Sequence, residues 1–165
     1  MNLTSLERLF VHELKDLYSA ENQLLQALPN MSEAAFTQQL KDKFESHRKE
    51  TEKHVQRLEE IFEDLDFEPG GEECDGMAGL ISEGEEIIQM DGDDSVKDAA
   101  LIAAAQRVEH YEIAGYGTAR SLARHLGNQK AEGLLQQTLE EEAAADKALT
   151  NLAESGSHIN KMAMG

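Results

Sequence analysis

Two glutamates, Glu109 and Glu112, lie in a stretch whose residue spacing otherwise predicts a buried helix face. Positions three and four residues apart turn one side of an α-helix toward a core. The stripe that contains them consists of Ala105, Glu109, Glu112, Tyr116, Ala119, Ala123 and Leu126. Burying a carboxylate without a partner costs several kcal/mol. Either the stripe is exposed at this level, or something positively charged lies between the helices.

Two acids in a later segment, Glu142 and Asp146, occupy stripe positions of the same kind. Gly127 lies between the two segments and predicts a turn, because glycine commonly ends helices. Residues equidistant from the turn of an antiparallel hairpin lie side by side. The midpoints of the pairs Glu109–Glu112 and Glu142–Asp146 average to about residue 127. We therefore expect both pairs of carboxylates at one level.

Glu21 and Glu50 belong to an earlier pair of helical segments. Their midpoint places the first turn at about residue 35.5, beyond Pro29. Proline normally ends or kinks a helix. A turn at Pro29 would nevertheless misalign the two carboxylates by roughly 20 Å, at about 1.5 Å per residue. We therefore expect the first helix to continue past Pro29.

Two histidines share a helix face with Glu50, since His47 precedes it by three residues and His54 follows it by four. Each is either a metal ligand or a neighbour of one, and we favour His54 as the ligand. We expect Tyr18 and Tyr116 to hydrogen-bond a carboxylate. We interpret His110 as lying on the surface or behind a ligand, and Glu140 and Glu141 as lying on the surface.

A cluster of carboxylates in a helical core implies a cation, because like charges repel one another by several kcal/mol. Carboxylates with one or two imidazoles suit iron or manganese, and zinc less specifically. We predict two divalent metal ions, iron foremost. The predicted ligands are Glu21, Glu50, Glu109, Glu112, Glu142, Asp146 and His54. The alternative is a wet seam or a dimer interface where the acids pair with Lys and Arg.

Four long helices are needed to bring these side chains together. The spacing predicts them from about residue 5 to 35, 37 to 65, 95 to 126 and 128 to 154, with Thr37 as the cap of the second. A shorter helix from Met77 to Met90 lies in the long connection. We predict an all-α, up-down four-helix bundle over residues 1–154, with a crossover that carries the short helix. Residues 155–165 lack periodicity and predict a flexible tail.

The composition fits this fold and limits the partners. Two prolines and 5% aromatic residues favour helix over a β-rich fold. The net charge of −18 repels phosphate backbones, so we expect neither nucleic acid nor an anionic membrane as partner. The acidity suits either a cation-binding protein or a host with salty cytosol.

The chain shows no pattern typical of export. Its one cysteine, Cys74, excludes an internal disulfide, and we expect its thiol to be inert. The N-terminus lacks the pattern of a signal peptide, and no apolar run reaches membrane-spanning length. We expect a cytoplasmic location.

The sequence resembles the ferritin-like superfamily and, more closely, the YciF/YciE family of bacterial stress proteins. Residues 13–21, 98–106, 108–114 and 138–142 carry the resemblance, and Val-Glu-His-Tyr-Glu-Ile-Ala at 108–114 is its most distinctive stretch. The resemblance extends to about residue 154. It implies a ferritin-like bundle, a homodimer, a rubrerythrin-like di-metal centre and a role in stress, with an electron donor that the sequence does not identify.

The same resemblance implies roles for individual ligands. It makes Glu50 and Glu142 the carboxylates that bridge two metals. Lys53 and Asp146 stand where the rubrerythrin-like pattern has histidine. The missing imidazoles imply an oxygen-rich and weakly held metal pair.

Our leading functional hypothesis is a di-iron or di-manganese protein that oxidises Fe(II) or reduces peroxide under stress. The alternative is a non-enzymatic helical assembly protein with a structural or vestigial metal site. We assign no catalytic residue from the sequence.

Overall fold

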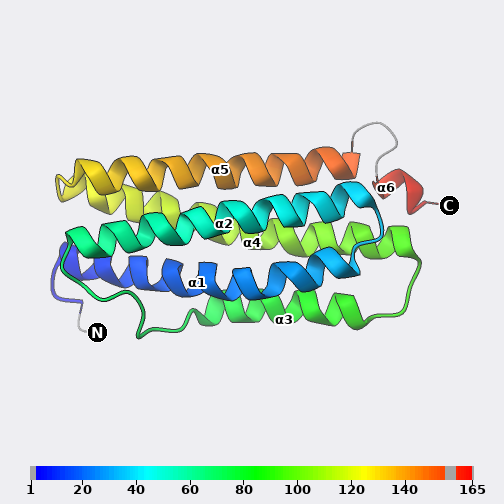
Figure 1. The fold of residues 1–165 in the computed structure, drawn as a ribbon, viewed down its shortest axis with the longest axis horizontal. Coiled ribbons are helices and arrows are strands. Elements are labelled where there is room, and N and C mark those ends of the chain that lie inside the picture. The colour runs from blue at the N-terminus through cyan, green and yellow to red at the C-terminus, as the bar shows by residue number, and fades with distance from the viewer. Residues whose placement is uncertain (1–2, 155–158, 165) are drawn as a thin grey trace.

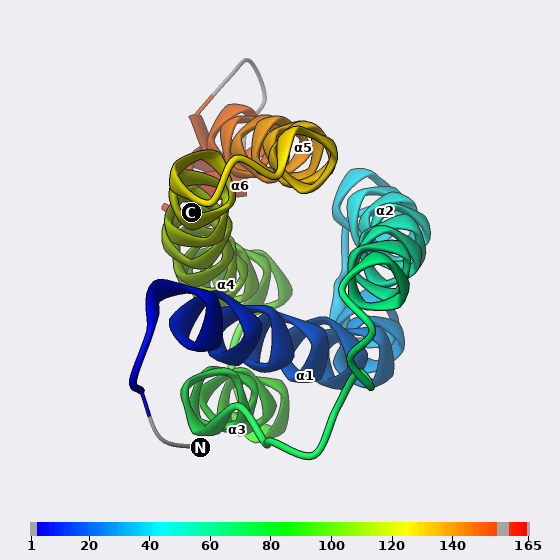
Figure 2. The same cartoon turned by 90° about the vertical axis from the view of Figure 1, so that its left-hand side faces the viewer.

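The computed structural model describes residues 3–154 and 159–164, and these residues form helices and connections without β-strands. The helices are α1 Leu6–Ala34, α2 Gln38–Asp64, α3 Asp75–Gln89, α4 Asp94–His125, α5 Gln129–Glu154 and α6 Ile159–Met162. The α1–α2 and α4–α5 hairpins lie side by side, and α3 covers α1 and α4 from outside (Figures 1 and 2). Because α3 carries the chain back along the bundle, α2 and α4 run in the same direction (Figure 1). The predicted all-α four-helix bundle with a helical crossover is confirmed.

The first helix continues through Pro29, as the counting of carboxylate levels predicted. Ser5 caps its start by accepting a hydrogen bond from the backbone N–H of Arg8 at 3.2 Å. Its last residue is Ala34, so the turn lies close to the predicted position. The second hairpin also turns where predicted. Gly127 there has a φ of +74°, in the left-handed region that glycine adopts without strain.

The start of α2 is capped by a residue that the sequence did not identify. Thr37 occupies the predicted cap position, but its side chain makes no capping hydrogen bond. The buried carboxylate of Asp98 on α4 accepts hydrogen bonds from the backbone N–H groups of Phe36 at 2.7 Å and Thr37 at 2.8 Å. This contact fixes the α1–α2 turn to α4.

Cys74 is the N-cap of the short crossover helix α3, and its thiol is buried. Its Sγ lies 2.9 Å from the hydroxyl of Tyr111 on α4, and that hydroxyl donates to Asp16 on α1 at 2.7 Å. A Cβ at Gly76 would lie 2.7 Å from the Tyr111 ring, so only glycine fits this contact. These contacts fix the N-terminal end of α3 to the bundle.

The C-terminal segment differs from our prediction of a flexible tail over 155–165. Residues 159–162 form the single turn α6, and Ile159 is buried against the core of the bundle. The part of the predicted tail at 155–158 and 165 lies outside the described residues. Within the described residues, no helix has the length and hydropathy needed to cross a membrane.

The core is divided along its length into two apolar clusters. One includes Leu24, Phe44 and Leu149, and the other includes Leu17, Leu58 and Leu135. The helices α1, α2 and α5 each contribute to both clusters, and each passes from one cluster to the other within a few turns. The buried residues between the clusters are polar, and they define the candidate site.

Candidate metal centre

A polar layer, contributed by all four long helices, separates the two apolar clusters. Its buried members are Glu21 from α1, His47, Thr51 and His54 from α2, Glu109 and Glu112 from α4, and Thr138 and Glu142 from α5. The layer arises because each helix places a polar residue at a stripe position that is otherwise apolar. The packing that buries the stripes therefore buries these side chains with them.

The first group of candidate ligands consists of His47, Glu109, Glu112 and Glu142. Each offers one ligand atom, and these atoms all lie within 4.8 Å of one another. His47 Nε2 lies 3.3 Å from Glu109 Oε1 and 3.8 Å from Glu142 Oε2. Four buried side chains from three helices thus converge on a volume the size of a metal ion's coordination sphere.

The second group consists of Glu21, His54 and Glu142, with ligand atoms again within 4.8 Å of one another. His54 Nδ1 lies 2.9 Å from Glu142 Oε1 and 3.3 Å from Glu21 Oε1. Glu142 belongs to both groups, so one of its oxygens faces each. A carboxylate shared in this way could offer one oxygen to each group.

Many polar atoms of these two groups are buried without a hydrogen-bond partner, although they lie close to one another. They are Glu21 Oε2, both nitrogens of His47, His54 Nδ1, Glu109 Oε2, both oxygens of Glu112 and both oxygens of Glu142. Buried polar groups in proteins are almost always satisfied, and each one left unsatisfied costs about 1–3 kcal/mol. Lone pairs that point at a common centre suit a cation. The donor set of carboxylates and imidazoles fits iron, manganese or zinc.

The electrostatics of the layer point the same way. Burial and the neighbouring carboxylate of Glu142 raise the pKa values of Glu109 and Glu112 well above the ordinary range. Burial alone would lower the pKa of His54, but the carboxylates of Glu142 and Glu21 beside its Nδ1 raise it to about 10. The layer therefore retains protons in the absence of a metal, and a metal ion would displace them.

Residues behind the ligands hold two of them in place. Tyr116 on α4 donates a short hydrogen bond to Glu21 Oε1. His54 Nε2 lies 2.9 Å from Glu141 Oε2, and Arg57 donates to both oxygens of Glu141, at 2.6 and 2.9 Å. An imidazole that donates from Nε2 can offer the lone pair of Nδ1 to a metal that displaces the second proton, and in this structure Nδ1 faces Glu21 and Glu142.

Some of the residues around the candidate ligands lie where the sequence predicted, and others do not. The expected hydrogen bond from Tyr116 to a carboxylate of the site is confirmed. Tyr18 also donates to a carboxylate, as expected, but the acceptor is Glu59 at 3.2 Å, away from the layer. Glu141 was expected on the surface, but its carboxylate pairs with His54 and Arg57. The His110 side chain is 67% exposed, which agrees with the surface position among its two predicted positions.

Five of the seven predicted ligands are brought together in the polar layer: Glu21, His54, Glu109, Glu112 and Glu142. The structure leaves Glu50 and Asp146 outside both groups. The Glu50 side chain is 34% exposed, with Oε2 3.5 Å from His47 Nδ1 and 4.0 Å from Lys43 Nζ. Asp146 is 22% exposed and accepts a hydrogen bond from Gln106 at 2.9 Å.

His47 was left open as a ligand and lies inside the first group. The signal for it was present in the sequence. The buried positions of α2 run Leu40, Phe44, His47, Thr51, His54 and Leu58, and Glu50 lies beside this stripe rather than on it. On α5 the buried positions run Thr138, Glu142, Ala145 and Leu149, which turns Asp146 to the flank of the helix.

Comparison with known proteins places the chain in a family. A family model described as a domain of unknown function, DUF892, matches residues 5–163. Protein YciF of Escherichia coli (strain K12) is 44% identical over 164 residues, which cover 99% of this chain and 98% of the relative.

Solved structures agree with this assignment. The crystal structure of the E. coli stress protein YciF matches with a TM-score of 0.88 at 45% identity, covering 90% of this chain and 94% of that chain. YcfI, a putative structural protein from Rhodopseudomonas palustris, matches with a TM-score of 0.89 at 40% identity, covering 93% and 98%. The predicted resemblance to the YciF/YciE stress proteins is confirmed, and the chain belongs to the DUF892 family.

Proposed function

We propose that the polar layer binds two divalent metal ions, iron foremost, and that the chain uses them to oxidise Fe(II) or to reduce peroxide under stress. The observation that carries the proposal is the set of buried, unpartnered lone pairs on two groups of side chains that share Glu142. His47, Glu109 and Glu112 would complete one metal position, and Glu21 and His54 the other. A bound iron pair would supply the two electrons that dioxygen or peroxide accepts.

The residues around the layer support this role. The apolar clusters on both sides exclude bulk water from the ligands, which strengthens electrostatic interactions inside the site. Tyr116 holds Glu21, and the Glu141–Arg57 pair holds His54. A site whose ligands are held in position needs little rearrangement when a metal binds.

The test begins with protein purified without chelator and analysed for bound metal, followed by Fe(II) addition under oxygen. We expect two metals per chain and an Fe(II) oxidation rate above that of buffer. Glu142→Gln should lose both metals because Glu142 serves both groups. Glu140→Gln, two residues away on the exposed side of α5, should bind metal as the unaltered chain does. Equal stoichiometry in Glu142→Gln would contradict the proposed site.

Glu50 requires a separate measurement, because the resemblance makes it a bridging ligand while its carboxylate lies outside both groups. If Glu50→Gln keeps the stoichiometry of two metals, the ligand set is the one built on His47. If Glu50→Gln loses a metal, its carboxylate moves inward on binding and the resemblance is the better guide.

A second candidate is an assembly protein whose metal is structural. The description of the R. palustris relative as a putative structural protein favours it. Two bound metals with Fe(II) oxidation no faster than in buffer would support this candidate over the first. We further propose a cytoplasmic homodimer without nucleic-acid or membrane partners, to be tested by light scattering of the purified chain and by cell fractionation.

A further inference from the structure

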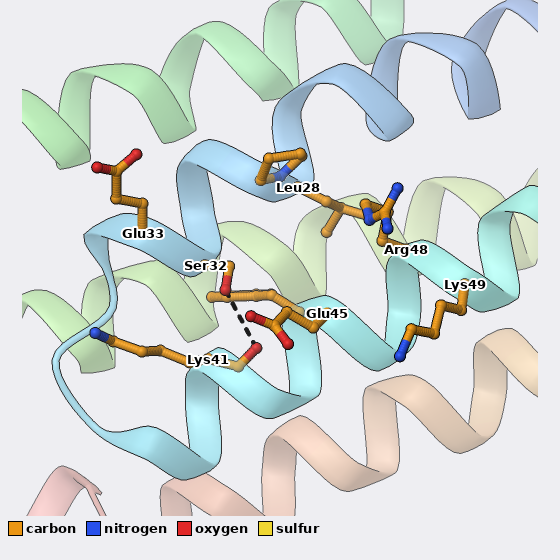
Figure 3. Close-up of a pocket in the computed structure, with 9 residues that line it drawn as sticks. Leu28, Ser32, Glu33, Lys41, Glu45, Arg48 and Lys49 are labelled. Carbon is orange, nitrogen blue, oxygen red and sulfur yellow. Dashed lines mark hydrogen bonds between the residues drawn. The ribbon is translucent and has the colours of Figure 1, made fainter.

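A surface cavity of about 570 Å³ lies between the last turns of α1 and the first turns of α2 (Figure 3). Its rim carries charged side chains, including Lys41, Arg48 and Lys49, and its floor contains Leu28 and Phe44. Both floor residues belong to the apolar core, with only 3% and 2% of their surface exposed. The floor of the surface cavity is therefore formed by side chains of the apolar core.

A second, inner cavity of about 10 Å³ lies on the other side of the same pair. Its walls are Leu24, Leu28, Met31, Phe44, Ala105, Val108 and Leu149, together with Lys43, His47 and Glu109. A volume of this size holds about one water-sized molecule. The inner cavity is almost wholly apolar, but it ends on two members of the first ligand group, His47 and Glu109.

Leu28 and Phe44 line both cavities, so a single layer of side chains separates solvent from the polar layer at this point. Leu28 also lies next to Pro29. Proline lacks a backbone N–H, so the carbonyl of Leu25 loses its helical donor and α1 is weakened at this turn. In the described part of α1 between Pro29 and the turn, one side-chain hydrogen bond reaches α2. Ser32 donates it to the carbonyl of Lys41 at 3.4 Å. This part of α1 can therefore shift with little loss of polar contact.

We propose that Leu28 and Phe44 form a gate through which a small uncharged molecule, with dioxygen as the type case, passes from the surface cavity to the polar layer. The use of such a gate rests on the proposed function, but the route is a property of the chain without metal. An apolar passage admits a small uncharged molecule such as dioxygen. It opposes ions, because a charged species would lose its hydration there.

A competing route leads through α3. A third cavity of about 20 Å³ shares Leu24, Met31 and Val108 with the inner cavity and is closed on its outer side by residues of α3, among them Ile88. A test must therefore shorten side chains in the proposed gate and in the α3 wall separately. Phe44→Leu thins the proposed gate, and Ile88→Ala thins the wall at α3. Phe62→Leu is a matched control, because Phe62 is a buried phenylalanine of the same helix in the other apolar cluster.

The first measurement uses metal-free protein and dissolved dioxygen as the probe. Dioxygen is paramagnetic, so the relaxation rate it adds to a methyl resonance reports how often it visits that methyl group. We expect Phe44→Leu to raise the dioxygen-induced relaxation of the Val108 methyls several-fold, while Phe62→Leu leaves it unchanged. Circular dichroism confirms that each variant is folded. An unchanged rate in Phe44→Leu, or an equal rise in Ile88→Ala, would overturn the proposed route.

The second measurement uses chain loaded with Fe(II) under anaerobic conditions and nitric oxide as the probe. We expect nitric oxide to bind several-fold faster in Phe44→Leu than in the unaltered chain or in Phe62→Leu, at equal metal content. Equal rates would count against the gate. If the chain binds no Fe(II), the proposed function fails, and the dioxygen measurement still decides the route.

Discussion

Replacing Glu112 by glutamine should stabilise the metal-free chain while it weakens metal binding. Glu112 is fully buried, and neither of its oxygens has a hydrogen-bond partner. Burial and the charges of Glu142, Glu21 and Glu109 raise its pKa well above the ordinary value of 4.5. Glutamine has the same shape and no charge, so it removes this electrostatic cost.

The size of the effect follows from proton linkage. A carboxyl held protonated at pH 7 against an ordinary pKa of 4.5 costs at most about 3.4 kcal/mol, at about 1.36 kcal/mol per pH unit. The folded chain binds the proton more tightly than the unfolded chain does. Its stability is therefore highest below pH 4.5 and falls as the pH rises toward the raised pKa. Because glutamine does not titrate, the advantage of Glu112→Gln should shrink to about 0.7 kcal/mol at pH 5.

The assay is urea unfolding of chelator-treated protein at pH 7 and pH 5, followed by circular dichroism because the chain has no Trp. Glu140→Gln serves as the control, since Glu140 is exposed and should change the free energy of unfolding little. Metal titration of the same samples should show weaker binding in Glu112→Gln. Destabilisation at pH 7, or an advantage that grows on acidification, would refute the reasoning.

Three further predictions concern residues outside the ligand groups. Asp98→Ala should lower the free energy of unfolding by about 3 kcal/mol or more, because two hydrogen bonds to a charged group are lost at about 1.5–3 kcal/mol each; Asp94→Ala, at an exposed position in the first turn of α4, is the control for urea unfolding. Glu141→Gln should weaken metal binding by about 10- to 100-fold without unfolding the chain, because the amide holds His54 less firmly, and a changed Co(II) absorption spectrum would show the altered ligand. Iodoacetamide should alkylate Cys74 slowly in the folded chain and rapidly in urea, because burial raises the pKa of its thiol; fast alkylation of the folded chain would contradict the buried position.

The level of each carboxylate along the bundle could be predicted from the sequence because a helix advances by a constant rise per residue. Counting about Gly127 brought Glu109 and Glu112 to the level of Glu142, and counting past Pro29 brought Glu21 to the level of Glu50, beside His47 and His54. The prediction required a helix that continues through proline, against local propensity, and the structure has it. Tertiary alignment was here a stronger guide than the propensity of one residue.

The rotation of each helix about its axis was predicted less well. Adjacent residues on a helix point about 100° apart, and a stripe drifts by about 20° per seven residues. A rotation of about 60° exchanges Glu50 for His47 on α2, and one of about 100° exchanges Asp146 for Ala145 on α5. Packing across the bundle decides such choices, and the sequence carries only an indirect record of it.

Contacts between distant segments were not predictable from local patterns. The cap of α2 comes from Asp98, 61 residues after Thr37 in the chain. Glu141 was interpreted as a surface residue, yet Arg57 and His54 approach it from α2. Such pairs require the fold before they can be recognised.

The partners of the buried acids favour a metal site over a seam of ordinary ion pairs. In a seam, Lys or Arg would neutralise the acids. In the part of the chain that the structure describes, the ion pairs of Glu21, Glu109 and Glu142 are all with histidine. Domains of this size are stable by only about 5–15 kcal/mol, so several unneutralised acids would remove much of that margin. The two apolar clusters can sustain the cost in the metal-free chain, and a bound cation reverses its sign. Stability that rises with added Fe(II) or Mn(II), and falls back with chelator, is therefore expected of the unaltered chain and should be lost in Glu142→Gln.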